Sequence, residues 1–347
     1  MKKILVLVVA VLQTVFLAAQ PQKDTLRILG VGNSWTRDSM RWLSAIARSA
    51  GRPVIVGHAY LGGSSLENQY RGIDDLTYTY RHGKQDQVVH ATYQYWKYAC
   101  SENPAKTPSS NVYKNGLNGC GVTLESVVTD EPWDIMVFQP SGPISGEARF
   151  RKAMSDSRDG YSLKNLELRI KQMMRPEVAE RIRVWVMIPF TYAPGNADHR
   201  KHIRDEFPDG IDYDTQAGWD EAYLLHDAAL QEKVPQLAAH IGAAGTVNVG
   251  RAISAARADG ELNKSGFCLQ RSERNTHLSE GLAMYVASLA YAYTLLDIKP
   301  SDISFYPEKS ADSHLTGDRG ETVKAEFVLT AELAAKARRL VWDALYE

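Results

Sequence analysis

Short apolar runs alternate with longer mixed segments along most of the chain, and each run ends at a polar or glycine-containing turn. Between the runs, apolar residues recur three and four positions apart, which predicts amphipathic helices. Strands that alternate with helices are typical of a parallel sheet covered by helices. We therefore expect an α/β fold. Its predicted buried strands are residues 26–31, 53–60, 133–138, 184–189 and 245–249.

The predicted helices differ in their patterns. The segment 39–50 follows the first strand, and 215–239 forms a long helix that we expect to be interrupted around Pro235. The segment 282–296 is almost entirely apolar, which is typical of a helix buried on all sides. Near the end of the chain, apolar positions from Thr330 to Tyr346 form one stripe and predict a C-terminal helix.

One stretch departs from the alternation of strands and helices. Residues 77–119 are irregular, contain closely spaced aromatic residues, and predict a β-hairpin insertion. Its aromatic side chains could stack on sugar rings or simply pack in the protein. No linker rich in Ser, Pro or Gly divides the chain, so residues 20–347 predict one domain, with the insertion at about 77–119 and a C-terminal extension at about 300–347.

The N-terminus has the plan of a secretory signal peptide. Lys2 and Lys3 precede an apolar run, and small residues follow before Gln20. We expect cleavage after residue 19, which leaves a secreted or periplasmic protein. The apolar run is short for a membrane span, so a retained anchor is the weaker alternative and no span is expected after cleavage.

Charge and cysteine content narrow the possible classes. The chain has 40 Lys and Arg against 41 Asp and Glu, for a net charge of -1, and these charges are dispersed. Such a surface argues against binding to nucleic acid or to an anionic membrane. In an oxidising compartment Cys100 and Cys120 could form a disulfide and leave Cys268 unpaired, although three buried thiols fit equally well.

The polar loop 190–214 contains four residues of metal-ligating types. Its candidate ligands have helical spacing, but without a further clustered ligand this pattern favours a solvated surface. We expect no metal and no other cofactor. The residues concerned are Asp198, His199, His202 and Asp205.

Candidate catalytic residues lie where predicted strands end. Ser34 follows the first strand in a Gly-Asn-Ser turn, where α/β sheets bind ligands and where a nucleophile would be useful. Alternatively, Ser34 caps the helix that follows. Gly62 and Gly63 follow the second strand, where glycine exposes backbone N–H groups, and we favour Gly63 as a donor. A simple tight turn is the alternative for this pair.

Two further residues complete the set. Gln139 ends the third strand, and its side-chain amide could donate to an oxyanion or serve only as a polar strand end. His277 lies shortly before the apolar helix 282–296. A histidine beside a serine hydroxyl can act as its general base.

The order of these residues resembles the conserved blocks of the SGNH (GDSL-like) hydrolase superfamily. The chain is most similar to a little-characterised secreted branch, with WDIMVFQPSG at the third block and HLSEG at the fifth. This resemblance implies a flavodoxin-like, three-layer α/β/α fold with a five-stranded parallel sheet. It also implies ester hydrolysis through an acyl-serine, in which His277 deprotonates Ser34. The N–H groups of Ser34 and Gly63 and the amide of Gln139 would form the oxyanion hole.

The chain departs from the family at the catalytic acid. The family has an Asp three residues before its histidine, whereas Arg274 occupies that position here. Glu273 is the nearest carboxylate and is our candidate for the acid; otherwise a backbone carbonyl must orient His277. We expect a secreted esterase that removes acyl groups, chiefly O-acetyl groups, from a carbohydrate or another small ester. The alternatives are a catalytically impaired glycan-binding protein and a lipid esterase or thioesterase.

Overall fold

The computed structural model of the chain describes most of the residues between 25 and 347. The described ranges are 25–74, 77–82, 85–90, 94–98, 123–157, 160–192, 200–207, 209–263, 277–307 and 329–347.

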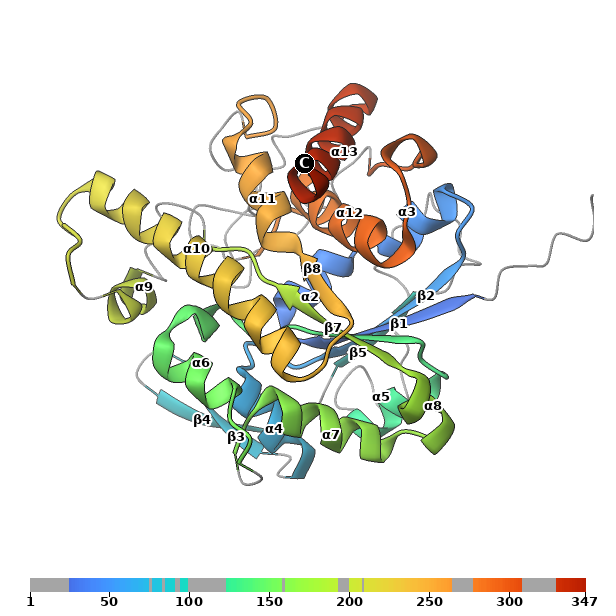
Figure 1. Cartoon of the computed structure of the whole chain (residues 1–347), viewed down its shortest axis with the longest axis vertical. Coiled ribbons are helices and arrows are strands. Elements are labelled where there is room, and N and C mark those ends of the chain that lie inside the picture. The colour runs from blue at the N-terminus through green and yellow to red at the C-terminus, as the bar shows by residue number, and fades with distance from the viewer. Residues whose placement is uncertain are drawn as a thin grey trace, which may run out of the picture.

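A twisted sheet forms the centre of the fold (Figure 1). Its strand order is β5-β2-β1-β6-β7-β8, and all neighbours are parallel except β5, which runs antiparallel to β2. The five parallel strands therefore have the order 2-1-3-4-5, which is the flavodoxin-like arrangement. The bounds are β1 Leu26–Gly32, β2 Val54–Tyr60, β5 Gln94–Tyr98, β6 Ile135–Phe138, β7 Arg183–Ile188 and β8 Gly245–Asn248.

Helices cover both faces of the sheet and create two hydrophobic cores (Figure 1). Successive residues of β1 point to opposite faces, so Ile28 enters one core and Leu29 the other. The first core includes side chains from α2 Ser34–Met40, α3 Leu43–Ser49, α11 Val249–Ala258, α12 Leu282–Leu296 and α13 Ala331–Tyr346. The second includes side chains from α4 Leu66–Asp74, α5 Leu124–Asp130, α6 Glu147–Ala153, α7 Leu163–Met173 and α8 Pro176–Arg181.

The three-layer α/β/α fold with a five-stranded parallel sheet is therefore confirmed, and so are its two additions. Within the predicted insertion, β3 Thr77–His82 and β4 Gln85–His90 form an antiparallel pair, and β5 extends the sheet at its edge. The C-terminal helix is α13, which begins one residue after its N-cap, Thr330. Short elements complete the described chain: η2 Gly142–Ser145, α9 Arg200–Glu206, α10 Gln216–His240 and η3 Pro300–Asp302.

Two helices differ from the sequence prediction. The first begins at Ser34 rather than at residue 39, and it ends at Met40 before α3 resumes the helical path. The break follows two contacts of Trp42, whose backbone N–H donates to Ser288 Oγ at 3.0 Å and whose indole N–H donates to the Glu280 carbonyl at 2.6 Å. The second is α10, which continues through Pro235 without the expected interruption.

Several predictions lie outside the described residues. They concern the signal peptide at 1–19 and the three cysteines, so cleavage and disulfide formation stay predictions. Among the helices that the structure describes, none has the length and apolar content needed to span a membrane.

Candidate active site

The turn between β1 and α2 is held by Asn33. Its side-chain oxygen accepts from the Trp35 backbone N–H at 3.0 Å, which makes Asn33 the N-cap of α2. Its amide nitrogen donates to the Ser64 carbonyl at 3.1 Å and so ties this turn to the loop after β2. Ser34 is the first residue of α2 and not its cap, which removes the alternative assignment of Ser34 as a capping residue.

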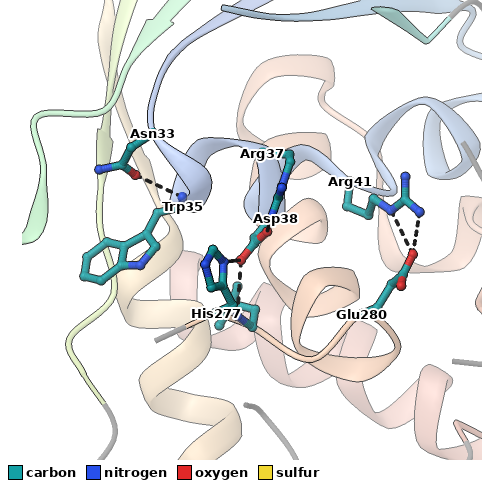
Figure 2. Close-up of polar contacts among 8 residues, drawn as sticks. Asn33, Trp35, Arg37, Asp38, Arg41, His277 and Glu280 are labelled. Atoms are coloured by element: carbon teal, nitrogen blue, oxygen red, sulfur yellow. Dashed lines mark hydrogen bonds and ion pairs between the residues drawn. The ribbon is translucent and has the colours of Figure 1, made fainter. Parts of the chain in front are cut away.

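Asp38 lies one helical turn after Ser34, so the two side chains project from the same side of α2. The Asp38 carboxylate is completely buried, and both of its oxygens have hydrogen-bond partners. Oδ2 lies 2.8 Å from His277 Nδ1 and accepts from the Leu278 N–H at 3.3 Å (Figure 2). Oδ1 accepts from Arg37 Nε at 3.3 Å and Nη2 at 3.1 Å. The His277 ring therefore lies against the helix that carries Ser34, and its side chain keeps 12% exposure.

Asp38 is the site residue that sequence reasoning missed. The sequence prediction starts the helix at residue 39, which leaves Asp38 in a turn. A start at Ser34 reveals the four-residue spacing between a hydroxyl and a carboxylate. Glu273 and Arg274 lie outside the described residues, so the role assigned to Glu273 stays a prediction, whereas Nδ1 of His277 has a carboxylate partner in Asp38.

Gln139 lies directly beside the turn that leads to Ser34. It follows β6, the neighbour of β1 at the point where the strand order reverses, which is where such sheets bind ligands. A Cβ on Gly32 would lie 2.9 Å from Gln139 Cβ and 3.1 Å from Oε1, so the missing side chain at Gly32 makes room for the amide. Gln139 is 1% exposed, and neither of its amide atoms has a hydrogen-bond partner in the part of the chain that the structure describes.

The loop after β2 brings glycine backbone to the same edge of the sheet. The Leu61 N–H donates to the Gly32 carbonyl at 2.9 Å, which fixes the loop next to the end of β1. Gly63 is exposed and has φ 60°, a left-handed conformation that favours glycine. Ser34, Gly63 and Gln139 thus follow three adjacent strands, as the sequence predicted.

A second histidine, His58, is buried near Asp38 but has a different character. It lies on β2, it is 1% exposed, and its pKa is lowered to about 3 by burial and by the Arg37 and Arg41 cations. His58 is therefore neutral at physiological pH and does not take up a proton in the range where a general base works. His277, with its partly exposed ring, is the better candidate for the base.

Another polar cluster joins the segment after β7 to α9, α10 and η2. His226 Nδ1 lies 2.6 Å from Thr191 Oγ1, and its Nε2 lies 3.9 Å from Glu206 Oε2. The Ser145 hydroxyl donates to Glu206. Burial raises the pKa of Glu206 to about 7, although Ser145, Arg149 and Lys233 oppose this effect. Trp35 connects this cluster to the turn at Ser34, because it stacks on Phe190 at 4.5 Å, next to the segment that carries Thr191.

The four residues with metal-like spacing are only partly described by the structure. His202 and Asp205 lie on α9, while Asp198 and His199 lie outside the described residues. Within the described ranges, His, Cys, Asp and Glu side chains form no group of three or more that could hold a metal ion.

Comparison with known proteins supports the fold. No protein-family model and no curated protein matches the sequence. Among solved structures, a DUF4886 family protein from Bacteroides uniformis is similar over 93% of this chain and 96% of its own, with 17% identity and a TM-score of 0.59. At this identity the similarity shows a shared α/β fold and nothing about activity.

A gut microbial diltiazem-metabolizing enzyme is also similar, with 14% identity and a TM-score of 0.39. The match covers 81% of this chain but spans only about half of that enzyme, 48% of its length. This likeness is too weak to support a functional argument.

Proposed function

We propose that the chain is a serine hydrolase that cleaves acyl esters, with Ser34 as nucleophile, His277 as general base and Asp38 as the acid that orients the base. The observation that carries this proposal is the 2.8 Å contact between His277 Nδ1 and an Asp38 carboxylate that lies one helical turn from Ser34. A carboxylate at Nδ1 holds the proton there and leaves Nε2 to accept the proton of the serine. The sequence had assigned this role to Glu273.

The reaction would proceed in two steps. Ser34 Oγ attacks the ester carbonyl while His277 Nε2 takes its proton, and the imidazolium then gives this proton to the departing alcohol. Water attacks the resulting acyl-serine, again with His277 as the base, and releases the carboxylic acid and the Ser34 hydroxyl. Asp38 stabilises the imidazolium in both steps, and no cofactor takes part in them.

The oxyanion hole would consist of the backbone N–H groups of Ser34 and Gly63 and the side-chain amide of Gln139. Support comes from the position of Gln139 against Gly32 and from its buried amide, which makes no other hydrogen bond with the described residues. A buried amide without a partner is costly in a folded protein, so such a group at a strand end is often kept for a functional reason.

The substrate class follows from the resemblance to SGNH hydrolases and from the predicted signal peptide. We propose a secreted or periplasmic esterase that acts on O-acetyl groups of a carbohydrate or on another small ester. The alternative of an impaired glycan-binding protein arose from Arg274. Asp38 weakens it, because His277 has a carboxylate partner without the residue that the family places at position 274. A lipid esterase or thioesterase would prefer long acyl chains.

The decisive experiment is the Ser34→Ala variant. We expect it to fold normally, to lose hydrolysis of 4-nitrophenyl acetate, and to lose labelling by a fluorophosphonate. Ser49→Ala is a matched control, because this serine on α3 bonds only to the Ile46 carbonyl one turn back in the described structure. A preference for acetate over longer acyl chains would support the carbohydrate substrate. Labelling at another serine would refute the mechanism.

A further inference from the structure

A buried ion pair lies beside the contact between His277 and Asp38. Arg41 Nε lies 3.1 Å from Glu280 Oε1, and Arg41 Nη2 bonds to the same oxygen (Figure 2). The two side chains are 10% and 5% exposed. Arg41 comes three residues after Asp38, and Glu280 comes three residues after His277. The same two segments are therefore joined twice with equal spacing.

From this arrangement we infer that Arg41 and Glu280 are positioning residues that hold His277 in register against α2. The inference rests on the proposed function. The two contacts carry their charges in opposite order. In the first, α2 provides the carboxylate of Asp38; in the second, Arg41, which directly follows α2, provides the cation and Glu280 the carboxylate. If the two segments were displaced by three residues relative to each other, either Glu280 would face Asp38 or Arg41 would face His277. Like charges facing each other in a buried site are strongly unfavourable, so the pattern specifies one register.

Backbone contacts show how this register reaches the histidine. Glu280 is fixed through its carbonyl, which accepts from the Trp42 indole at 2.6 Å, as well as through its side chain. Leu278 is fixed by its N–H on Asp38 at 3.3 Å. The segment that begins at His277 is therefore tied to α2 through the His277 ring and the Leu278 N–H. Three residues after His277, Glu280 ties it to Arg41 and Trp42, which follow α2.

Glu280 has a second effect near His277, because its carboxylate compensates the charge of Arg41. The Arg41 cation is close enough to His58 to contribute to lowering the pKa of that ring, after burial and Arg37. A cation in this region disfavours a protonated imidazole, and the proposed mechanism requires His277 to become protonated. Glu280 neutralises Arg41, while Arg37 is matched by Asp38.

The test compares Glu280→Gln, Arg41→Met and the double variant Arg41→Met/Glu280→Met. Turnover of 4-nitrophenyl acetate, its KM, the rate of fluorophosphonate labelling and Tm are measured for each protein. In the single variants we expect kcat and labelling to fall at least about tenfold with KM nearly unchanged, because a misplacement of about 1 Å can cost about a hundredfold. Asp156→Asn is the control, since it removes an exposed ion pair with Lys164.

The double variant separates positioning from stability. Replacing a buried ion pair by apolar side chains often restores stability, so Tm should recover while kcat stays low. Recovery of kcat together with Tm would show a merely structural pair and overturn the inference. Should Glu280→Gln fail to fold, Glu280→Asp and Arg41→Lys keep the charges but alter the reach, and wild-type kcat in both would also overturn it.

The outcomes also distinguish this inference from the proposed function. If the wild type hydrolyses ester through Ser34 and the Arg41 and Glu280 variants are fully active, only the positioning role is refuted. A wild type without Ser34-dependent hydrolysis refutes the proposed function, and the positioning role fails with it.

Discussion

Two pairs of an acid and a histidine near the carboxyl ends of the strands differ in distance, exposure and charge balance. His277 Nδ1 lies 2.8 Å from Asp38, whereas His226 Nε2 lies 3.9 Å from Glu206. The His277 side chain is 12% exposed and that of His226 is 1% exposed. Asp38 accepts two bonds from Arg37, while burial dominates at Glu206 and raises its pKa to about 7.

The two pairs thus share their residue types but differ in their surroundings, and only the His277 pair is part of the proposed site. The His226 pair connects the segment after β7 with α9 and α10, and its histidine is shielded from solvent. In the His277 pair, Asp38 lies on the helix that begins with Ser34, and the His277 ring has access to solvent. Solvent access of the ring, the shorter contact to the acid and the charge balance of that acid are therefore the features that support the proposed catalytic role of His277.

The largest difference in activity between the two pairs is expected when each acid is changed to its amide. Asp38→Asn removes the charge that stabilises the imidazolium and presents an amide N–H₂ that can force the wrong tautomer on His277. We expect kcat for 4-nitrophenyl acetate to fall by about ten-thousand-fold, the loss known for the equivalent change in a serine protease. Glu206→Gln should keep kcat within about twofold. Equal effects of the two substitutions would contradict the distinction between the pairs.

A smaller loss of activity is expected when the proposed oxyanion donor, Gln139, is removed. Gln139→Ala removes the buried amide beside Gly32, and we expect kcat to fall about a hundredfold or more with little change in KM, because such a donor acts mainly in the transition state. Gln236→Ala on the exposed side of α10 is a control for loss of a glutamine amide. An unchanged kcat in Gln139→Ala would leave this residue a structural strand end.

The smallest effect on activity, but a clear one on stability, is expected from pH. The pKa of Glu206 is raised from 4.5 to about 7 in the folded protein, so the folded state holds this proton more tightly than the unfolded state. Its contribution to stability is complete below about pH 4.5 and is lost as the pH rises through 7. Glu206→Gln should lack this loss, and its unfolding free energy relative to wild type should rise by up to about 3 kcal/mol between pH 4.5 and 8.

Denaturant unfolding of both proteins at several pH values measures this difference. Only the change between the two proteins is compared, because groups distant from Glu206 contribute equally to both. A constant difference across the range would mean that folding does not raise the pKa of Glu206.

The fold and part of the candidate site can be predicted from the sequence for the same physical reason. Ser34 and Gln139 follow apolar runs, and parallel strands place their carboxyl ends together, so local pattern was sufficient to group them. Asp38 was not accessible in this way, because its contact with His277 joins residues 239 positions apart. Its helix also begins earlier than predicted, since Asn33 rather than a later residue provides the cap.

The path of α10 illustrates another limit of local reasoning. Proline removes one helical hydrogen bond and usually bends or ends a helix. Here Val234 and Leu237, on either side of Pro235, are completely buried in the second core. Tertiary packing thus preserves a helix that propensity alone would divide.

The origin of Ser34 and Asp38 in one turn of α2 has a consequence for biosynthesis. Both residues come early in the described part of the chain, whereas His277 follows Asp38 by 239 residues. At roughly 5–20 residues per second, a ribosome needs about 10 to 50 s to cover that distance. During that time the growing chain would hold Ser34 and Asp38 without His277. If the proposed mechanism holds, ester hydrolysis would begin only when His277 docks on α2, and the onset of activity would report the completion of folding.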